Sequence, residues 1–332
     1  AMCFCVKHPT DPQEETHILW RTIGLRLLLG LVTIWAVSVL IFAATNVLPG
    51  DAARAILGRA ATPEAVAKLQ AEMGLDRPLL TQYLGWVSGL VHLDLGKSLV
   101  TRGPVMDLVS PRFGNSLILL CVTSVIAIPL SVLAGIAMAL TNGRGFDNIA
   151  NTVLIALAGI PEFIVGIILI VLFSTQVFAI LPPTSMVPIG QTVLGNPRVL
   201  VLPVATLVLA ILPYLARLVR SALIDALSSE YVVTARLKGI PEGQIIVRHA
   251  LRNSLLPAIQ ATALSLGYIL GGAIVVEFIF QYPGMGTALR DAVGSRDLFV
   301  IQAVVLIFAC SYVLFNLAAD VLSIIVTPRL RG

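Results

Sequence analysis

Charge is scarce in this chain of 332 residues, of which only 12% are charged and 57% are hydrophobic. The mean hydropathy is +0.94. A soluble globule of this length could not bury so much apolar surface, so the composition excludes a soluble protein and indicates an integral membrane protein. The alternation of polar and apolar residues that a membrane β-barrel requires is missing as well.

Cysteine is also scarce. The four cysteines include no Cys-x-x-Cys pair, so the chain has no disulfide framework of the kind that small secreted proteins use. Cys3 and Cys5 lie near His8 in the N-terminal tail. With no further ligand nearby these three residues make a poor metal site, and we expect no metal in this chain.

Known catalytic motifs are missing as well. The four histidines are scattered, and neither His-Glu-x-x-His nor Gly-x-Ser-x-Gly occurs. Gly96-Lys97-Ser98 resembles the end of a P-loop, but the glycine that a P-loop needs five residues earlier is replaced by Val91. We therefore expect no enzymatic activity, no cofactor and no nucleotide site in this chain.

Long apolar windows occupy most of the sequence. Each can hold the roughly 20 residues that cross about 30 Å of hydrocarbon. The windows are residues 27–50, 113–143, 148–197 (interrupted only by Glu162), 199–216, 253–276 and 298–319. We predict an all-α integral membrane protein with six transmembrane helices, the first of which is a retained anchor rather than a cleaved signal.

The composition divides the chain into four regions. Residues 1–22 are predicted to be a tail, 23–50 the first transmembrane helix, 51–112 an extracytoplasmic lobe, and 113–332 a transmembrane core that contains a polar segment at 221–257. Within the lobe, Thr62 and Pro63 predict a helix start and Gly74 a helix end.

Lysine and arginine gather at one set of predicted helix ends. They are Lys7, Arg21, Arg26, Arg144, Arg217, Arg220, Arg236, Lys238, Arg248, Arg252, Arg329 and Arg331. The positive-inside rule places these ends, and both termini, in the cytoplasm. The net charge of +4 is therefore a topology signal, and we expect no nucleic-acid partner.

Residues 229–257 form a polar, basic segment between two apolar windows. Gly239 is predicted to break this segment into two short helices, the first capped by Ser228 or Ser229 and the second opening at Pro241. Ile245, Arg248, His249 and Arg252 recur at helical spacing in the second. A bent helix pair suits docking to a soluble protein, and the alternative is an amphipathic segment lying on anionic lipid.

This segment resembles the cytoplasmic coupling loop of ABC importer permeases, specifically the dipeptide/oligopeptide and nickel branch and the first permease subunit of that branch. The matching residues are Glu230-Tyr231-Val232, Thr234-Ala235-Arg236, Lys238-Gly239, Arg248-His249-Ala250-Leu251-Arg252-Asn253 and Pro257. Leu48-Pro49-Gly50-Asp51, Gln281-Tyr282-Pro283-Gly284 and the closing Asn316 and Asp320 match the same branch in order. Val233 departs from the general loop signature, and Thr327 replaces the usual aspartate.

The resemblance implies a permease subunit of an ATP-driven importer that forms half of a pore for di- or oligopeptides in the bacterial inner membrane. It implies four kinds of partner: a homologous second permease, cytoplasmic ATPases that use ATP and Mg²⁺, an extracytoplasmic substrate-binding protein, and membrane lipid. The residues expected to couple to the ATPase are Glu230, Ala235, Arg236, Lys238, Gly239, Arg248, His249 and Arg252. Nickel, glutathione-like peptides or opines are alternative cargoes, and an ion-coupled secondary transporter is the alternative of another class.

Charged residues inside or beside the apolar windows are the remaining candidates. A lone carboxylate in hydrocarbon is costly and usually faces a partner or a water-filled cavity. Glu162, Glu277 and Gln281 are predicted to line the translocation pathway, or alternatively to bind water or a neighbouring helix near the span ends. Asp320 is predicted to make an interhelical contact.

The predicted lobe offers two basic candidates, Arg59 and Lys68, for contact with the binding protein. The alternative is that the lobe only stabilises the outer ends of the membrane helices.

Overall fold

The structure, a computed structural model, describes residues 12–47, 61–72, 76–175, 177–187 and 192–326. Its helices are α1 (Pro12–Val47), α3 (Pro63–Glu72), α4 (Leu79–Val91), α5 (Val105–Leu140), α6 (Gly145–Ala158), α7 (Glu162–Ile170), α8 (Arg198–Leu227), α9 (Glu230–Leu237), α10 (Glu242–Gln244), α11 (Leu251–Phe280), α12 (Met285–Ser295) and α13 (Leu298–Val326), with π-helical turns at Val171–Thr175 and Ile245–Ala250. Within the described residues the chain has no β-strand, so the all-α prediction is confirmed.

Four described segments are long and apolar enough to cross a membrane: Ile23–Asn46, Val105–Leu140, Arg198–Leu227 and Leu298–Ala318. Two bent pairs could each add a span. The pair of α6 with α7 and its π-helical turn bends by 100°, and the pair of Gly267–Phe280 with α12 bends by 69°. The structure therefore provides four to six spans rather than six uninterrupted helices.

The third predicted window, residues 148–197, is only partly helical. Its helical part ends at Thr175, and most of the described remainder is loop. Pro161, which has no N–H to donate, occupies the N-cap of α7 and separates it from α6. By contrast, α5 begins at Val105, which lies within the predicted lobe (residues 51–112) and before the predicted apolar window (residues 113–143).

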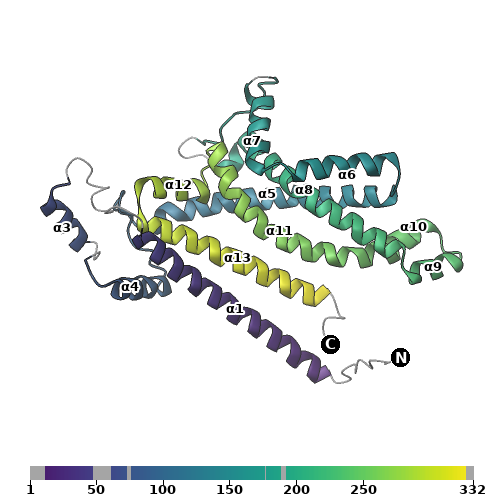
Figure 1. Cartoon of the computed structure of the whole chain (residues 1–332), viewed down its shortest axis with the longest axis horizontal. Helices are drawn as coiled ribbons and strands as arrows, with labels where there is room; N and C mark the ends of the chain where they lie inside the picture. The colour runs from purple at the N-terminus through teal and green to yellow at the C-terminus, as the bar shows by residue number, and fades with distance from the viewer. Residues whose placement is uncertain (1–11, 48–60, 73–75, 176, 188–191, 327–332) are drawn as a thin grey trace.

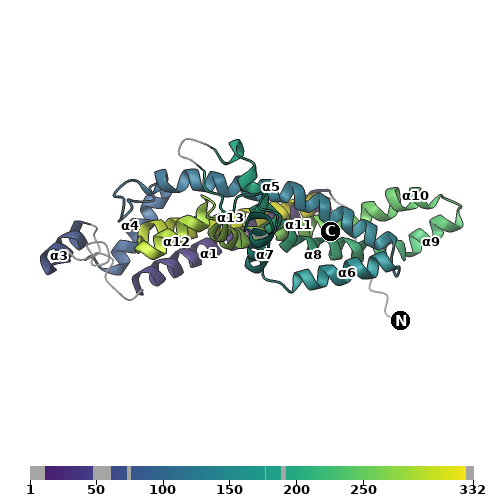
Figure 2. The same ribbon diagram turned by 90° about the horizontal axis from the view of Figure 1, so that it is seen from above.

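The long helices run side by side (Figure 1). The start of α1, the α5–α6 turn, α9, α10 and the end of α13 lie toward one end of the bundle, while α3, α4 and α12 lie toward the other. The view from above keeps α3 and α9 at opposite extremes (Figure 2). The described beginning and end of the chain therefore lie on the same side as the predicted coupling segment.

Close helix packing holds the centre of the bundle. A Cβ added to Gly135 of α5 would lie 2.6 Å from the carbonyl oxygen of Ala216 and 2.7 Å from Cβ of Val219, both on α8. Small residues allow this approach in a membrane, where helices associate through packing rather than water exclusion. At the periphery, Arg26 of α1 and Asp320 of α13 form an ion pair of 2.8 Å, which confirms the interhelical contact predicted for Asp320.

The lobe is fastened to the bundle by aromatic and polar contacts. Tyr83 and Trp86 of α4 pack against Phe42 of α1, with ring centroids 5.3 and 6.2 Å away, and the Tyr83 hydroxyl lies 2.9 Å from Oγ of Ser38. Thr62 caps α3 as predicted, because its Oγ1 accepts the N–H of Ala65 at 3.2 Å. The predicted helix end at Gly74 lies outside the described residues.

Candidate functional site

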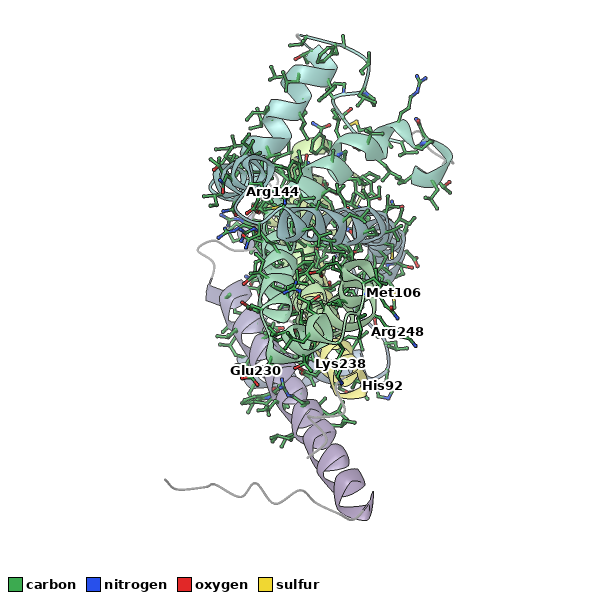
Figure 3. All side chains as sticks on the ribbon, turned by 90° about the vertical axis from the view of Figure 1, so that its right-hand side faces the viewer. His92, Met106, Arg144, Glu230, Lys238 and Arg248 are labelled. Carbon is green, nitrogen blue, oxygen red and sulfur yellow. The ribbon has the colours of Figure 1, made fainter. Side chains whose placement is uncertain are left out.

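The predicted coupling segment is a bent pair of helical arms at one end of the bundle. The first arm is α9, and Gly239 follows it with a φ of +74°. Pro241 then occupies the N-cap of α10, which continues through the π-helical turn into α11. The predicted break at Gly239 is therefore confirmed. Figure 3 looks onto this end, where Glu230, Lys238 and Arg248 are labelled together with Arg144 of the α5–α6 turn.

The cap at the start of α9 differs from the prediction. Ser229 occupies the N-cap position in an extended conformation, but its hydroxyl donates to the carbonyl of Ala226 at 2.5 Å and makes no capping bond. The peptide N–H groups of Val232 and Val233 instead reach the backbone carbonyl of Ser229. Backbone hydrogen bonds, and not a side-chain cap, therefore start α9.

One side of α9 is built into the bundle. Val232 and Ala235 are buried in a cluster with Leu223 of α8, Ile245 of the π-helical turn and Ala139 of α5. Ala235, predicted as a coupling residue, therefore packs inward and holds α9 in place. A displacement of α9 would be transmitted directly to the ends of α5, α8 and α11, because interiors packed this closely respond as units.

The opposite side of α9 carries exposed apolar groups. Leu237 is 84% exposed and Val233 is 46% exposed, whereas Tyr231, which is 42% exposed, lies nearer the buried side of the helix. Val233 and Leu237 are four residues apart, so they share a helix face. Glu230 and Lys238 are exposed beside them. An apolar ridge with a charged border is typical of a surface that binds a protein groove.

An ion pair joins the two arms. Nε of Arg236 lies 2.7 Å from Oε1 of Glu242, with about half of each side chain exposed. Exposed pairs of this kind contribute at most about 1 kcal/mol, so its role is to favour one angle between the arms rather than to stabilise the fold. The Arg236 guanidinium is thus already engaged within the segment.

The second arm departs from regular helical spacing. Residues Ile245–Ala250 form a π-helical turn, so the spacing of 3.6 residues assumed for Ile245, Arg248, His249 and Arg252 was wrong. Ile245 points into the buried cluster, whereas Arg248 is exposed. The side chains of His249 and Arg252 lie outside the described part of the structure.

A buried ion pair supports this end of the bundle. Asp147, in the first turn of α6, is 1% exposed and takes two bonds from Arg220 of α8, at 2.6 and 2.7 Å. The carboxylate also accepts the N–H of Gly143, and Arg220 donates to the side chain of Asn142. The network ties the α5–α6 turn to the last part of α8, from which α9 departs.

Glu277 lies in a closed hydrogen-bonding network at the end of α11. It is 1% exposed, accepts the hydroxyl of Ser116 at 2.6 Å and accepts the N–H of Gly286 at 2.6 Å. Oγ of Ser116 in turn accepts the N–H of Met285 at 2.8 Å. The carboxylate and the Ser116 hydroxyl thus each accept one of the free backbone N–H groups at the start of α12, where negative charge is favourable. This geometry favours the alternative interpretation, contact with neighbouring helices.

The turn around Glu277 is so tight that two of its positions require glycine. A Cβ at Gly284 would lie 2.4 Å from the Glu277 carboxylate, and one at Gly286 would lie 2.7 Å from the backbone of Ile274. Gln281, the third predicted pathway residue, has a left-handed φ of 50° and is exposed where α11 ends. Glu277 and Gln281 therefore face different surroundings.

Glu162 lies on a polar face of the apolar helices. It is half-buried in the first turn of α7, and a Cβ at Gly272 of α11 would lie 3.8 Å from its Oε1. Tyr268, one turn earlier on α11, is 58% exposed and lines a cavity of about 430 Å³ with Tyr214 and Arg217 of α8. We call these four residues, Glu162, Tyr214, Arg217 and Tyr268, the polar face. Polar side chains at membrane depth are costly against lipid, so this face should meet protein or water.

Of the two lobe candidates, only Lys68 is described. It is exposed on α3, at the end of the molecule opposite α9, whereas Arg59 lies outside the described residues.

Comparison with known families decides what kind of protein this is. Residues 131–332 match the family described as "Binding-protein-dependent transport system inner membrane component", and residues 17–120 match the N-terminal part of such membrane components. The chain belongs to this family. It is an inner-membrane permease component of a binding-protein-dependent ABC transporter, and the family description implies an ATPase and a substrate-binding protein as partners.

Known relatives of this permease cover nearly its whole length. The chain is 37% identical, over 308 residues, to the glutathione transport system permease protein GsiC of Escherichia coli (strain K12), which is 92% of this chain and 98% of the relative. It is 36% identical, with the same coverage, to the protein of that name from Shigella boydii serotype 4 (strain Sb227). The family is a transport component rather than an enzyme.

The Gly96-Lys97-Ser98 sequence of the permease has a structural role. The Ser98 hydroxyl donates to the buried carboxylate of Asp297, which also accepts the N–H of Leu99 at 3.1 Å. The same Ser98 oxygen accepts the N–H groups of Val100 and Thr101. The motif therefore fastens the end of the lobe to the α12–α13 turn.

Leu237, the most exposed apolar side chain of α9, and most of the polar face were not predicted from the sequence. Leu237 lies immediately before Lys238-Gly239, and its spacing of four from Val233 was the available signal. Tyr214 and Tyr268 gave none, because tyrosine is common near the ends of membrane spans, whatever its role.

Proposed function

We propose that this permease subunit imports short peptides by forming one half of a pore, and that a separate ATPase drives it through α9 and α10. The observation that carries the proposal is the two-sided construction of α9. Its inner side is packed into the ends of α5, α8 and α11, and its outer side leaves Leu237 exposed. A partner that binds over Leu237 would therefore be coupled through α9 to the ends of the membrane helices α5, α8 and α11.

The similarity to glutathione permeases supports a peptide cargo, since glutathione is a tripeptide. The polar face supports a pathway at the boundary with a second, homologous permease. It places a carboxylate on α7 and a guanidinium and two phenols on α8 and α11, and the guanidinium and the phenols line one cavity. The Arg217 cation and the phenol hydroxyls offer partners for the carboxylate and amide groups of a peptide.

We infer an orientation from the clustering of arginine and lysine at the α9 end. That end is cytoplasmic, with both termini, and the lobe is extracytoplasmic. In a background without native cysteines, Ala71→Cys should react with an impermeant thiol reagent added outside, and Gly243→Cys should react only after permeabilisation. Labelling of both sites from outside, or the reverse pattern, would contradict the orientation.

The same labelling assay tests the pathway. Tyr268→Cys should be labelled in the assembled transporter because water reaches the polar face, and added peptide should slow that labelling. Val125→Cys is the matched control, since Val125 is 73% exposed on the apolar surface of α5, where lipid should exclude the reagent. Equal labelling of the two sites would remove Tyr268 from the pathway.

We further propose that the lobe seats the binding protein, with the exposed Lys68 as a contact and Arg59 as its predicted companion. Lys68→Glu should slow association of the binding protein at low salt and have little effect at high salt, because rim charges act mainly on the association rate. Surface-immobilised transporter would report both rates. Unchanged association at low salt would leave Lys68 outside the docking surface.

A further inference from the structure

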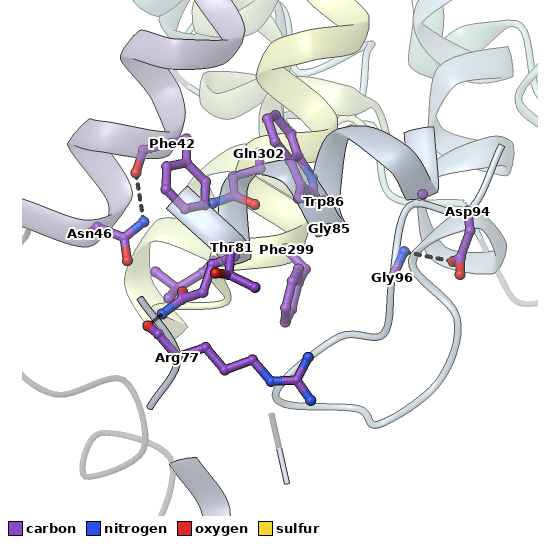
Figure 4. A pocket seen from close by; sticks show the side chains of 13 residues that line it. Phe42, Asn46, Arg77, Thr81, Gly85, Trp86, Asp94, Gly96, Phe299 and Gln302 are labelled. Carbon is purple, nitrogen blue, oxygen red and sulfur yellow. Dashed lines mark hydrogen bonds between the residues drawn. The ribbon is translucent and has the colours of Figure 1, made fainter. Parts of the chain in front are cut away.

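A second cavity lies between the lobe and the membrane helices, far along the chain from the polar face. Its volume is about 250 Å³, and it is enclosed by α1, α4, the 94–96 loop and the start of α13. Figure 4 shows the side chains that line it, with Trp86 and Gln302 in its inner wall and Arg77 reaching across beneath Phe299. One water molecule occupies roughly 30 Å³ in the liquid, so the cavity is larger than one or two bridging waters would fill.

Two buried polar atoms in this wall have no hydrogen-bond partner. They are the indole Nε1 of Trp86, a donor, and Oε1 of Gln302, an acceptor. The other end of the Gln302 amide is fixed, because Nε2 donates to Oγ1 of Thr45 at 2.8 Å. Trp86 is 8% exposed and Gln302 is 4% exposed. Leaving such groups unpaired is costly. Neither atom has appreciable solvent-accessible surface, so a solute that both accepts and donates would pair with them once the side chains around them shift.

Charges of both signs border the same cavity. Arg77 and Asp94 line it together, and both are exposed. One carboxylate oxygen of Asp94 accepts the N–H of Gly96 at 2.9 Å, which fixes the side chain at the rim. Phe42, Phe299 and Trp86 supply apolar walls between the polar groups. A peptide group carries one donor and one acceptor, and a free short peptide adds a carboxylate and an ammonium group.

From these contacts we propose that the cavity is a binding site for a short zwitterionic peptide at the extracytoplasmic entrance. The peptide group pairs with Trp86 and Gln302, the terminal carboxylate with Arg77 and the ammonium group with Asp94. The site would hold cargo between its release by the binding protein and its entry into the pore. This role rests on the proposed peptide cargo and on the proposed orientation, but binding itself requires neither the ATPase nor transport.

The test uses the full-length chain in nanodiscs, titrated calorimetrically with alanyl-alanine. Saturable binding at one site is expected. Trp86→Phe keeps an aromatic ring but removes the donor, and it should weaken binding about tenfold, the loss expected for one buried hydrogen bond. Arg77→Gln, at the exposed rim, should weaken binding of alanyl-alanine and abolish its advantage over alanyl-alaninamide. Lys97→Gln is the control, because Lys97 is an exposed cation of the same region that does not line the cavity.

Absence of saturable binding at millimolar peptide would overturn the proposal, and so would binding that Arg77→Gln and Trp86→Phe leave unchanged. Thermal unfolding of each variant separates loss of the site from loss of the fold, and the rim variant is expected to unfold as the parent does. The binding test of this cavity and the transport test of the proposed function can fail independently. Failure of binding with intact ATP-driven peptide uptake removes this site alone, whereas binding without such uptake removes the importer function.

Discussion

Gly239→Val is expected to lower ATP-driven uptake about tenfold or more while leaving the permease folded in the membrane. Gly239 has a φ of +74°, and no atom lies within 4 Å of the position that a Cβ would occupy. The substitution therefore acts through the backbone alone, by disfavouring a left-handed residue by about 1–2 kcal/mol. The two arms would lose their angle, and the ATPase would lose its docking surface. Uptake into proteoliposomes and retention of the ATPase during purification would measure the effect.

Two matched variants isolate the cause. Gly243→Val adds the same side chain to the same segment, also into open space, at a position where φ is not left-handed, so it should retain uptake. Gly239→Asn should recover much of the activity, because asparagine tolerates the left-handed region better than valine does. If Gly239→Val transported peptide and held the ATPase as well as the parent, the proposed role of the segment would be wrong.

Asp147→Ala should produce the largest loss of stability among the single changes considered. It leaves the partly buried Arg220 guanidinium without its carboxylate, and breaking such a pair costs about 3–5 kcal/mol when both charges are buried. Since the Arg220 side chain is 23% exposed, we expect a loss of stability near the lower end of this range. Because the network joins the α5–α6 turn to α8 just before α9, uptake should fall as well. Thermal unfolding in nanodiscs and uptake assays would measure the two effects.

Asp291→Ala provides the comparison for Asp147. Asp291 also pairs with arginine, but its side chain is 48% exposed, so its removal should cost less than about 1 kcal/mol. The double variant Asp147→Ala with Arg220→Met should be more stable than Asp147→Ala alone, because it removes the unpaired charge. Equal stability of Asp147→Ala and the parent would show that the pair does not support this end of the bundle.

The helical class and the break at Gly239 could be predicted because they depend on local signals. Apolar run length sets a membrane helix, and a glycine followed by proline ends one helix and starts another. The interhelical contact of Asp320 could also be predicted, since a carboxylate near a span end needs a partner.

The bent pairs and the π-helical turn could not be predicted, because tertiary packing decides them. Nothing in the composition of residues 148–197 says where the chain leaves the membrane, and the π-helical turn shifts Ile245 into the buried cluster. The network of Glu277 joins α11 to Ser116 of α5, 161 positions away in sequence. Contacts of such long range leave no periodic signal in the sequence.

The energy source of transport tests most directly whether a separate ATPase drives this permease. The transporter would be purified from native membranes through a tag on this chain, reconstituted into liposomes, and supplied with binding protein and peptide on the extracytoplasmic side. We predict that an ATPase and a second permease co-purify, and that uptake requires ATP on the α9 side. Uptake driven by an ion gradient with this chain alone, and without ATP, would contradict the account.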